Sequence, residues 1–457
     1  MKTIFITVFE GVESKNILHT DVLKTLLATP DVRAVLFVKN KERQAYHERE
    51  FRDPRIEYAV VEPTRARGVD HFFSRLKFLL LDTKTVMMRR QMLLARTKTL
   101  RAWVGYGMGL LLRKILARQF FVRLTRMLDE ALVRDETYAS FFERYHPDLV
   151  LCANLFDEPE VNLIREAKKR GVKTIGLINS WDKATARSVL RLVPDRTIVF
   201  NEIIKKDMMV YHAIREQDIF VGGLPQYDEY FTGTRMKREE FFREIGCDPA
   251  KRLIVYSPLG TAFTNTDWER IDLLSNMHRA GRLGADTEFF VRFPPYDTID
   301  LGELERRPHS KYDYPGARFS RVRLTEWDMT TREVSHLADT LFHMSLLICH
   351  ASSISVDAAV FDRPVINISF EVSDREIMPD LQQRLYRMTH YVEALKSGGI
   401  RLVDSREELA AWVQKYLDDS TLDQEGRVRL AREQCPFRDG KSGERIGRFI
   451  IDYLMSP

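Results

Sequence analysis

At 457 residues, with 44% hydrophobic and 30% charged content, the chain has the composition of a globular protein too long for one ordinary core, so two domains are expected. No run of about 18 uncharged apolar residues occurs, and the N-terminus enters an apolar segment at once, so a cytoplasmic protein without a signal peptide or membrane span is expected. The four cysteines lack metal-ligand spacing, which predicts reduced, mostly buried thiols and no metal site.

The charge is unevenly distributed along the chain. Residues 64–127 contain fifteen basic residues and two acidic ones, a local charge of +13 that leaves −8 for the remainder of a chain whose net charge is +5. A local excess of this kind indicates the nature of a partner, whereas the average does not.

The first 62 residues have the pattern of a doubly wound α/β domain. Strands are predicted at residues 3–9, 34–38 and 56–61, and a helix at 19–28. The segment 10–16 after the first strand is predicted to be a loop at the mouth of a site. Glu10, Glu13 and His19 are candidate general bases there, although a charged surface loop is the commoner case.

A basic helical insertion is predicted at about residues 64–135, with two or three helices. Apolar and basic residues interleave in it at near-helical spacing. Three interpretations stay open: an interfacial membrane platform, a buried helical hairpin whose basic side chains reach outward, and a nucleic-acid surface, for which stacking or base-reading motifs are missing. We therefore expect no nucleic-acid partner and a peripheral membrane contact through 64–127 as one alternative.

The α/β pattern resumes at residue 141, with strands predicted at 147–152, 172–178 and 196–200 and a helix at 158–170. The tetrapeptide Ser180-Trp-Asp-Lys183 ends one of these strands, where polar groups of α/β sheets meet ligands. Asp182 is a candidate base for an acceptor hydroxyl, or it fixes Lys183 and the loop.

A second α/β domain is predicted from residue 252, with a strand at 253–257 and a loop at 258–268 that offers Ser257, Gly260 and Thr261 as anion ligands. The strand at 289–293 carries Arg292, which can pin a phosphate or a base.

A short βαβ unit is predicted at residues 345–369: strand 345–349, turn 350–353, helix 354–361 and strand 365–368. Ser352 or Ser353 would cap the helix and bind an anion, together with His350. Asp357, one turn further on, is placed to meet a ribose diol. A pair of serines before a helix is, by itself, most often only a cap.

Several motifs in one order carry a family resemblance. The segments HPDLVL, TIGLINSWDK, PDRTIVFNE, VGGLPQYDEYF, VRFPP, DRPVI and DGKSGERI resemble bacterial surface-carbohydrate enzymes of the GT-B fold, especially the UDP-GlcNAc 2-epimerase-like and CDP-glycerol glycerophosphotransferase-like branches. The sequence departs from the pattern at Lys183, where Asn is common, at Phe200, where Trp is common, and after Arg292, where relatives often have a histidine.

The resemblance implies two Rossmann-like domains facing across a cleft: 1–231 with the insertion at 64–135, 232–439 for the nucleotide sugar, and a helix at 440–457 packing back on the first domain. It implies a metal-independent glycosyltransferase of surface-polysaccharide synthesis, on the cytoplasmic side of the membrane. The donor would be a UDP- or CMP-type nucleotide sugar with no further cofactor, bound by Ser257, Gly260, Thr261, Arg292, His350, Ser352, Ser353 and Asp357.

The acceptor would be a glycan or polyprenyl-linked molecule, with Asp182, Glu10 or His19, in that order, as the base. The alternatives are an epimerase of the 2-epimerase type, a CDP-alcohol phosphotransferase and a binding protein with a decayed site.

Overall fold

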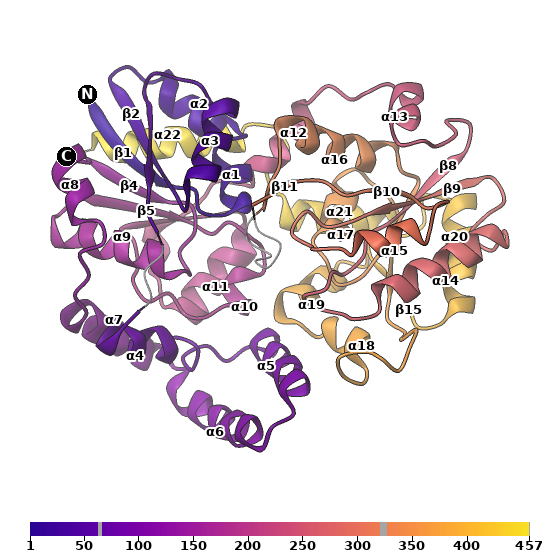
Figure 1. Ribbon diagram of the computed structural model, residues 1–457, viewed down its shortest axis with the longest axis horizontal. Coiled ribbons are helices and arrows are strands. Elements are labelled where there is room, and N and C mark those ends of the chain that lie inside the picture. The colour runs from indigo at the N-terminus through magenta and orange to yellow at the C-terminus, as the bar shows by residue number, and fades with distance from the viewer. Residues whose placement is uncertain (63–65, 320–326, 457) are drawn as a thin grey trace. The chain divides into compact units, whose positions relative to one another are not determined.

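The computed structural model describes residues 1–62, 66–319 and 327–456, which divide into two compact units (Figure 1). Unit 1 comprises Met1–Met87, Lys98–Phe231 and Cys435–Pro457, and unit 2 comprises Met88–Thr97 and Thr232–Gln434. Each unit is built around a parallel sheet with helices around it, which confirms the predicted α/β, GT-B-like class of fold.

The sheet of unit 1 has seven parallel strands among the described residues, in the order β3-β2-β1-β4-β5-β6-β7. The strands are β1 Lys2–Thr7, β2 Val32–Val38, β3 Ile56–Val60, β4 Leu149–Cys152, β5 Lys173–Leu177, β6 Arg196–Val199 and β7 Ile219–Val221. Every residue of β4 is buried, as expected for a sheet covered on both faces. The order reverses between β1 and β4, so a crevice for a ligand is expected at the carboxyl ends of these two strands.

Helices cover both faces of this sheet (Figure 1). Those of unit 1 are α1 Gly11–Ile17, α2 Asp21–Ala28, α3 Lys41–Glu50, α4 Gly68–Leu76, α6 Leu100–Leu116, α7 Gln119–Leu132, α8 Ala139–Tyr145, α9 Glu158–Lys169, α10 Lys183–Ala186, α11 Glu202–His212, α12 Asp228–Thr232 and α22 Ser442–Met455, while α5 Lys84–Thr97 is divided between the units.

The prediction of a loop at residues 10–16 is wrong, because helix α1 occupies most of that segment. A capping box explains the difference: the side chain of Glu10 accepts from the backbone of Glu13, and the side chain of Glu13 accepts from the backbone of Glu10. Charged residues that suggest a surface loop therefore start a helix, most of whose residues are buried.

The last helix, α22, packs on α2 near the N-terminus of the chain (Figure 1). Glycines allow the approach, since a Cβ atom on Gly443 would lie 2.9 Å from the backbone nitrogen of Asp21. The carboxylate of Asp228 accepts the N–H groups of Ser442 at 3.0 Å and of Gly443 at 2.7 Å, which anchors the start of α22. The C-terminal helix thus completes unit 1.

The substitution Gly443→Val is expected to push α22 off α2, because its branched side chain would meet backbone atoms that cannot move aside. Overpacking of this kind costs about 1–3 kcal/mol. Hydrogen exchange should accelerate in α22 and α2. Arg448→Ala, on the exposed face of the same helix, is the control and should leave exchange unchanged. Equal exchange in the two variants would contradict the packing argument.

The main sheet of unit 2 has six parallel strands in the described part of the chain, in the order β10-β9-β8-β13-β14-β15. They are β8 Arg252–Tyr256, β9 Thr287–Arg292, β10 Lys311–Asp313, β13 Leu346–Cys349, β14 Val365–Ile368 and β15 Arg401–Val403, with a separate antiparallel pair β11 Ala317–Arg318 and β12 Trp327–Asp328. The order reverses between β8 and β13. The predicted βαβ unit is confirmed as β13, α17 and β14.

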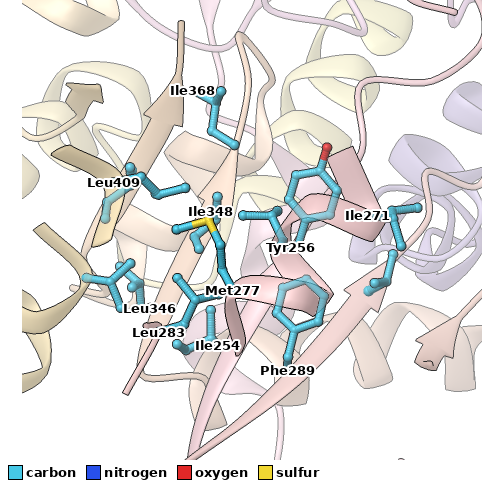
Figure 2. Packing of buried hydrophobic residues seen from close by; sticks show 14 of the residues in the cluster. Ile254, Tyr256, Ile271, Met277, Leu283, Phe289, Leu346, Ile348, Ile368 and Leu409 are labelled. Carbon is cyan, nitrogen blue, oxygen red and sulfur yellow. The ribbon is translucent and has the colours of Figure 1, made fainter. Parts of the chain in front are cut away.

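The helices of unit 2 are α13 Arg238–Glu244, α14 Asp267–Arg279, α15 Leu301–Glu305, α16 Thr331–His343, α17 Ile354–Val360, α18 Leu381–Leu385, α19 Thr389–Lys396, α20 Arg406–Asp418 and α21 Gln424–Gln434. Figure 2 shows the core between one face of the sheet and its helices, where Ile254 and Ile348 of the strands meet Met277 of α14 and Leu409 of α20. This core holds the strand ends in fixed register.

The basic insertion forms four helices among its described residues, α4 to α7, rather than two or three. Part of it is anchored in unit 1 by a small apolar cluster, Leu80, Leu81, Val86, Val122 and Val189. All four cysteines are buried thiols outside any disulfide, as predicted. Within the described ranges, no helix combines the length and the apolar character needed to cross a bilayer.

Candidate functional site

The carboxyl edge of the unit 1 sheet is formed by the segments that follow β1, β4 and β5. The hydroxyl of Thr7, at the end of β1, accepts the N–H of Ala153 after β4 at 3.0 Å. The side-chain amide of Asn16 in α1 donates to the carbonyl of Asn179 after β5 at 3.4 Å. These bonds hold three loops together at one edge of the sheet.

Lys183 begins α10 in the segment after β5 and is almost fully buried. Its Nζ donates to Oδ1 of Asn154 at 3.2 Å, and the amide of Asn154 donates to Oδ2 of Asp157 at 2.6 Å. Burial opposes ionisation of Asp157, but the positive charges of Lys183, Arg187 and Lys77 outweigh it and lower the pKa of the carboxyl. A buried ammonium group thus faces a chain of polar side chains.

Two buried carboxyl groups lie beside these polar side chains. Burial, together with the charge of Glu10, raises the pKa of Glu13 from 4.5 to about 8. Burial and the charge of Glu13 raise the pKa of Glu160 in α9 well above its ordinary value. Neither Oε1 of Glu13 nor either carboxyl oxygen of Glu160 has a hydrogen-bond partner among the described residues. We infer that this pair of carboxyl groups holds a proton near neutral pH.

The substitution Glu13→Gln should remove a pH dependence of stability. Because the folded-state pKa of Glu13 exceeds the unfolded one, the folded chain binds the proton more tightly. The stability that this proton contributes to the folded state is complete below pH 4.5 and is lost as the pH rises through about 8. Glutamine mimics the protonated acid. At pH 9 the variant should be more stable than the wild type by more than about 1 kcal/mol, and at pH 4.5 equally stable.

Denaturant titrations at several pH values would measure this difference. Glu50→Gln, at the exposed end of α3, is the control, since surface substitutions usually change stability by less than about 0.5 kcal/mol. A Glu13→Gln curve parallel to that of the wild type would show that the buried carboxyl is ionised at neutral pH.

The three predicted bases of unit 1 are not brought to one point. Asp182 caps α10 after β5, and its Oδ1 accepts the Ser180 hydroxyl at 2.5 Å. Glu10 caps α1 at the end of the first loop. His19 lies beyond the far end of α1, where its ring packs edge-on against Phe51 with 4.9 Å between the ring centres. Asp182 and Glu10 therefore lie on crevice-forming segments, whereas His19 belongs to the packing of α1 and α3.

The corresponding edge of the unit 2 sheet lies at the ends of β8 and β13. The N–H of Ser257 donates to the carbonyl of Ile348 at 3.0 Å, so Ser257 stands next to the predicted turn 350–353. The side chain of His350 does not reach the surface. It is fully buried, with Nε2 3.0 Å from the hydroxyl of Tyr256, and burial lowers its pKa to about 3. His350 therefore supports the turn as a neutral core residue.

A polar network behind the turn fixes its backbone. The hydroxyl of Tyr391 donates to the carbonyl of His350 at 3.2 Å and lies 3.0 Å from Oγ of Ser355, and the amide of Asn367 also donates to that carbonyl. In front of this network Ser353 is exposed and Ser352 half-buried.

One of the two predicted caps, Ser353, occupies the N-cap position of α17 but does not form the capping hydrogen bond, because its backbone is already helical. Asp357 follows one turn later and is 9% exposed. The anion and ribose roles of these residues stay predictions.

Carboxylates of the chain hold the loop after β8. Asp267 accepts the N–H groups of Leu259 at 3.2 Å and Gly260 at 2.7 Å, and burial raises its pKa to about 6. Asp297 accepts both the N–H of Thr261, at 3.1 Å, and its hydroxyl, at 2.6 Å. A phosphate at Gly260 and Thr261 would have to displace these carboxylates.

Arg292 is likewise engaged. Its buried guanidinium pairs with Asp313, which also lies 3.3 Å from Nε2 of His336. Burial opposes ionisation of Asp313, but Arg292 and His336 outweigh it and hold its pKa below the usual value. The next residue, Phe293, is buried beside Trp268 in the core.

A second network ties together two loops at the carboxyl edge of the unit 2 sheet. Arg270 of α14 is fully buried, and its Nη1 donates to the hydroxyls of Thr264 at 2.9 Å and Thr266 at 2.6 Å. Its Nη2 donates to Glu376 at 3.0 Å and to Glu371 at 3.3 Å, in the segment after β14. Arg270 therefore sets the geometry of the loops that flank the predicted donor site.

Sequence reasoning missed Asn154, Glu160 and Arg270. For Glu160 a signal was present, since it shares a helical face with the buried residues Leu163, Ile164 and Ala167, at offsets of three, four and seven. Asn154 and Arg270 lack such a local signal, because their partners are distant in the sequence.

Comparisons with known proteins place these two units in a known group. The family described as CDP-glycerol:poly(glycerophosphate) glycerophosphotransferase matches residues 171–452. A lipid-A-disaccharide synthase of Geobacter metallireducens is 23% identical over 321 residues, covering 67% of this chain and 76% of that protein.

Solved structures resemble the chain in fold. The UDP-GlcNAc 2-epimerase of Neisseria meningitidis bound to UDP-GlcNAc has a TM-score of 0.55 at 9% identity and covers 100% of both chains. The wall teichoic acid polymerase TagF has a TM-score of 0.52 at 13% identity and covers 99% of this chain and 89% of that one.

Proposed function

We propose that this chain, which belongs to the CDP-glycerol:poly(glycerophosphate) glycerophosphotransferase family, transfers a glycosyl group from a nucleotide sugar to a glycan or polyprenyl-linked acceptor. The donor is of the UDP or CMP type, and the product enters a bacterial surface polysaccharide at the cytoplasmic face of the membrane. The lipid-A-disaccharide synthases similar to this chain have names that describe joining sugars, which supports glycosyl transfer.

The observation that favours glycosyl over glycerophosphate transfer is the sequence at the end of β9, where Arg292 is followed by Phe293, Pro294 and Pro295. The pattern that this segment resembles has a histidine two residues after the arginine, and this chain has Pro294 there, so no imidazole is presented at this position. Transfer of a phosphoalcohol, the activity in the family's description, is the second candidate.

The donor half of the reaction is assigned to unit 2. Negative charge grows on the leaving phosphate as the glycosyl bond breaks, so donors aimed at that phosphate accelerate the reaction. Ser352 and Ser353 at the start of α17 supply hydroxyl and N–H donors. Arg292 supplies a cation once it exchanges Asp313 for the phosphate, and Asp357 takes the ribose.

The acceptor half is assigned to the crevice of unit 1, with Asp182 as the base that removes the acceptor proton and Glu10 as the alternative. Asp182→Asn should reduce turnover by about 10²- to 10⁴-fold while nucleotide binding is retained. Glu202→Gln is the control, because Glu202 also follows a strand of this sheet but is 75% exposed beside Lys205. Equal activity of Asp182→Asn and the control would exclude Asp182 as the base.

Nucleotide release from a panel of UDP-, CMP- and GDP-sugars and CDP-glycerol, with and without a polyprenyl-linked acceptor, tests the proposed function. We expect release that needs both a nucleotide sugar and the acceptor and that survives EDTA. Turnover of CDP-glycerol would establish the second candidate, and consumption of a sugar nucleotide without acceptor would establish an epimerase. Binding of no nucleotide would identify a decayed site.

A further inference from the structure

Helix α6 presents the reverse of the usual surface-helix pattern. Its buried positions are Gly109 and Arg113, whereas six of its large apolar side chains are exposed to solvent. The exposed set is Leu100, Trp103, Val104, Met108, Leu111 and Ile115, from 49% exposed at Ile115 to 80% at Leu100. A surface helix normally buries such residues.

The exposed residues form one continuous stripe. Their spacings of one, three or four residues place them within an arc of about 140° at 100° per residue, along a helix about 25 Å long. Contiguous apolar surface of this extent on a globular protein marks an interaction site. Single exposed apolar residues, such as Val428 on α21, need no such explanation.

The inner side of α6 is marked by Gly109 and Arg113, its two buried residues. Nε of Arg113 donates to the carbonyl of Gly109 within the same helix at 3.1 Å, and its guanidinium lies 4.0 Å from the carboxylate of Asp82. At about 100° per residue both buried positions lie on the side of the helix opposite the apolar stripe, which therefore faces outward.

The charge around the stripe identifies its partner. From residue 83 to residue 128 the sequence contains no acidic residue. Arg101, Lys114 and Arg118 are exposed at or beside the stripe. Basic side chains that flank an apolar stripe match a membrane surface, because anionic headgroups attract the charges and the acyl boundary takes the apolar residues.

We propose that α6 docks in the plane of an anionic membrane, with its apolar stripe inserted at the headgroup boundary. A second copy of the chain fits the stripe less well, because face-to-face α6 helices would bring two basic segments together without acidic residues to offset them. Nucleic acid would leave the apolar arc unused. The inference stands apart from the proposed function, since it rests on α6 and its surroundings alone.

Flotation of the full chain with vesicles tests the proposal. We expect binding to phosphatidylcholine mixed with phosphatidylglycerol, weaker binding to phosphatidylcholine alone, and loss of binding as salt rises. Leu111→Glu should weaken binding by about 10-fold or more, because one apolar anchor is lost. Val428→Glu, which adds the same charge to an exposed valine elsewhere, should bind as the wild type does. Both variants should keep the wild-type unfolding temperature.

Insertion is distinguished from simple electrostatic attraction by fluorescence. Brominated lipids should quench tryptophan emission of the wild type, and Trp103→Phe should abolish that quenching. The proposal is overturned if Leu111→Glu binds vesicles like the wild type, or if binding occurs without quenching at Trp103. It is also overturned if the chain forms a dimer that Leu111→Glu dissociates while vesicles are not bound.

Discussion

Replacing Arg270 with methionine is expected to destabilise unit 2 by about 3–5 kcal/mol, because the change leaves the buried carboxylate of Glu376 and the partly buried one of Glu371 without their cation. Methionine fills much of the same space but provides none of the donors that reach Thr264, Thr266, Glu371 and Glu376. Native-state hydrogen exchange should report the loss, with faster exchange in the segments after β8 and β14.

Two further variants separate this network from a general effect of removing arginine. Arg375→Ala removes an arginine that is 76% exposed and pairs with Glu269, and an exposed pair contributes about 1 kcal/mol or less. Arg270→Lys keeps the charge but cannot bridge two hydroxyls and two carboxylates at once, so an intermediate loss is expected. If Arg270→Met were no worse than Arg375→Ala, the network would not hold the loops.

The succession of strands and helices was predictable because local sequence patterns determine it. The short apolar runs and the breaker Asp362-Arg-Pro364 predicted β13, α17 and β14 to within one residue at most of their boundaries. The miss at α1 has the same local origin. Its charged residues suggested a loop, and only the reciprocal capping of Glu10 and Glu13 turns them into a helix start.

The candidate site was less predictable, because burial decides what each side chain can do. His350 and Arg292 were assigned to a ligand from their position after strands, yet one is a neutral core residue and the other is paired with Asp313. Glu160 and Lys183 acquire their importance from the buried charges that they share, Glu13 and Asp157, although strands and loops separate them in the sequence. Burial also decides the role of the basic insertion, because the sequence alone did not show which side of each helix is buried and which is exposed.

Replacing Asp129 with alanine is expected to destabilise unit 1 by about 3–5 kcal/mol, since it removes one partner of a buried charge cluster. The carboxylate of Asp129, near the end of α7, accepts from Arg191 at 2.7 Å and from Arg165 at 2.6 Å. Arg191 also pairs with Asp70 of α4 at 2.7 Å and with Glu158 of α9. Burial opposes the charge of Arg191, but Asp129, Glu158 and Asp70 outweigh it and raise the pKa of the guanidinium.

This prediction decides how the basic insertion is attached to unit 1. If the cluster is the attachment, Asp129→Ala should accelerate hydrogen exchange in α4 and α7 before the strands of the sheet. Glu130→Ala offers a matched control on the same helix, because its carboxylate is 51% exposed and 3.9 Å from Lys168, where a loss of at most about 1 kcal/mol is expected. Uniform acceleration across unit 1 would instead place Asp129 in the common core, and equal effects of the two variants would show that the apolar cluster around Val122 carries the attachment.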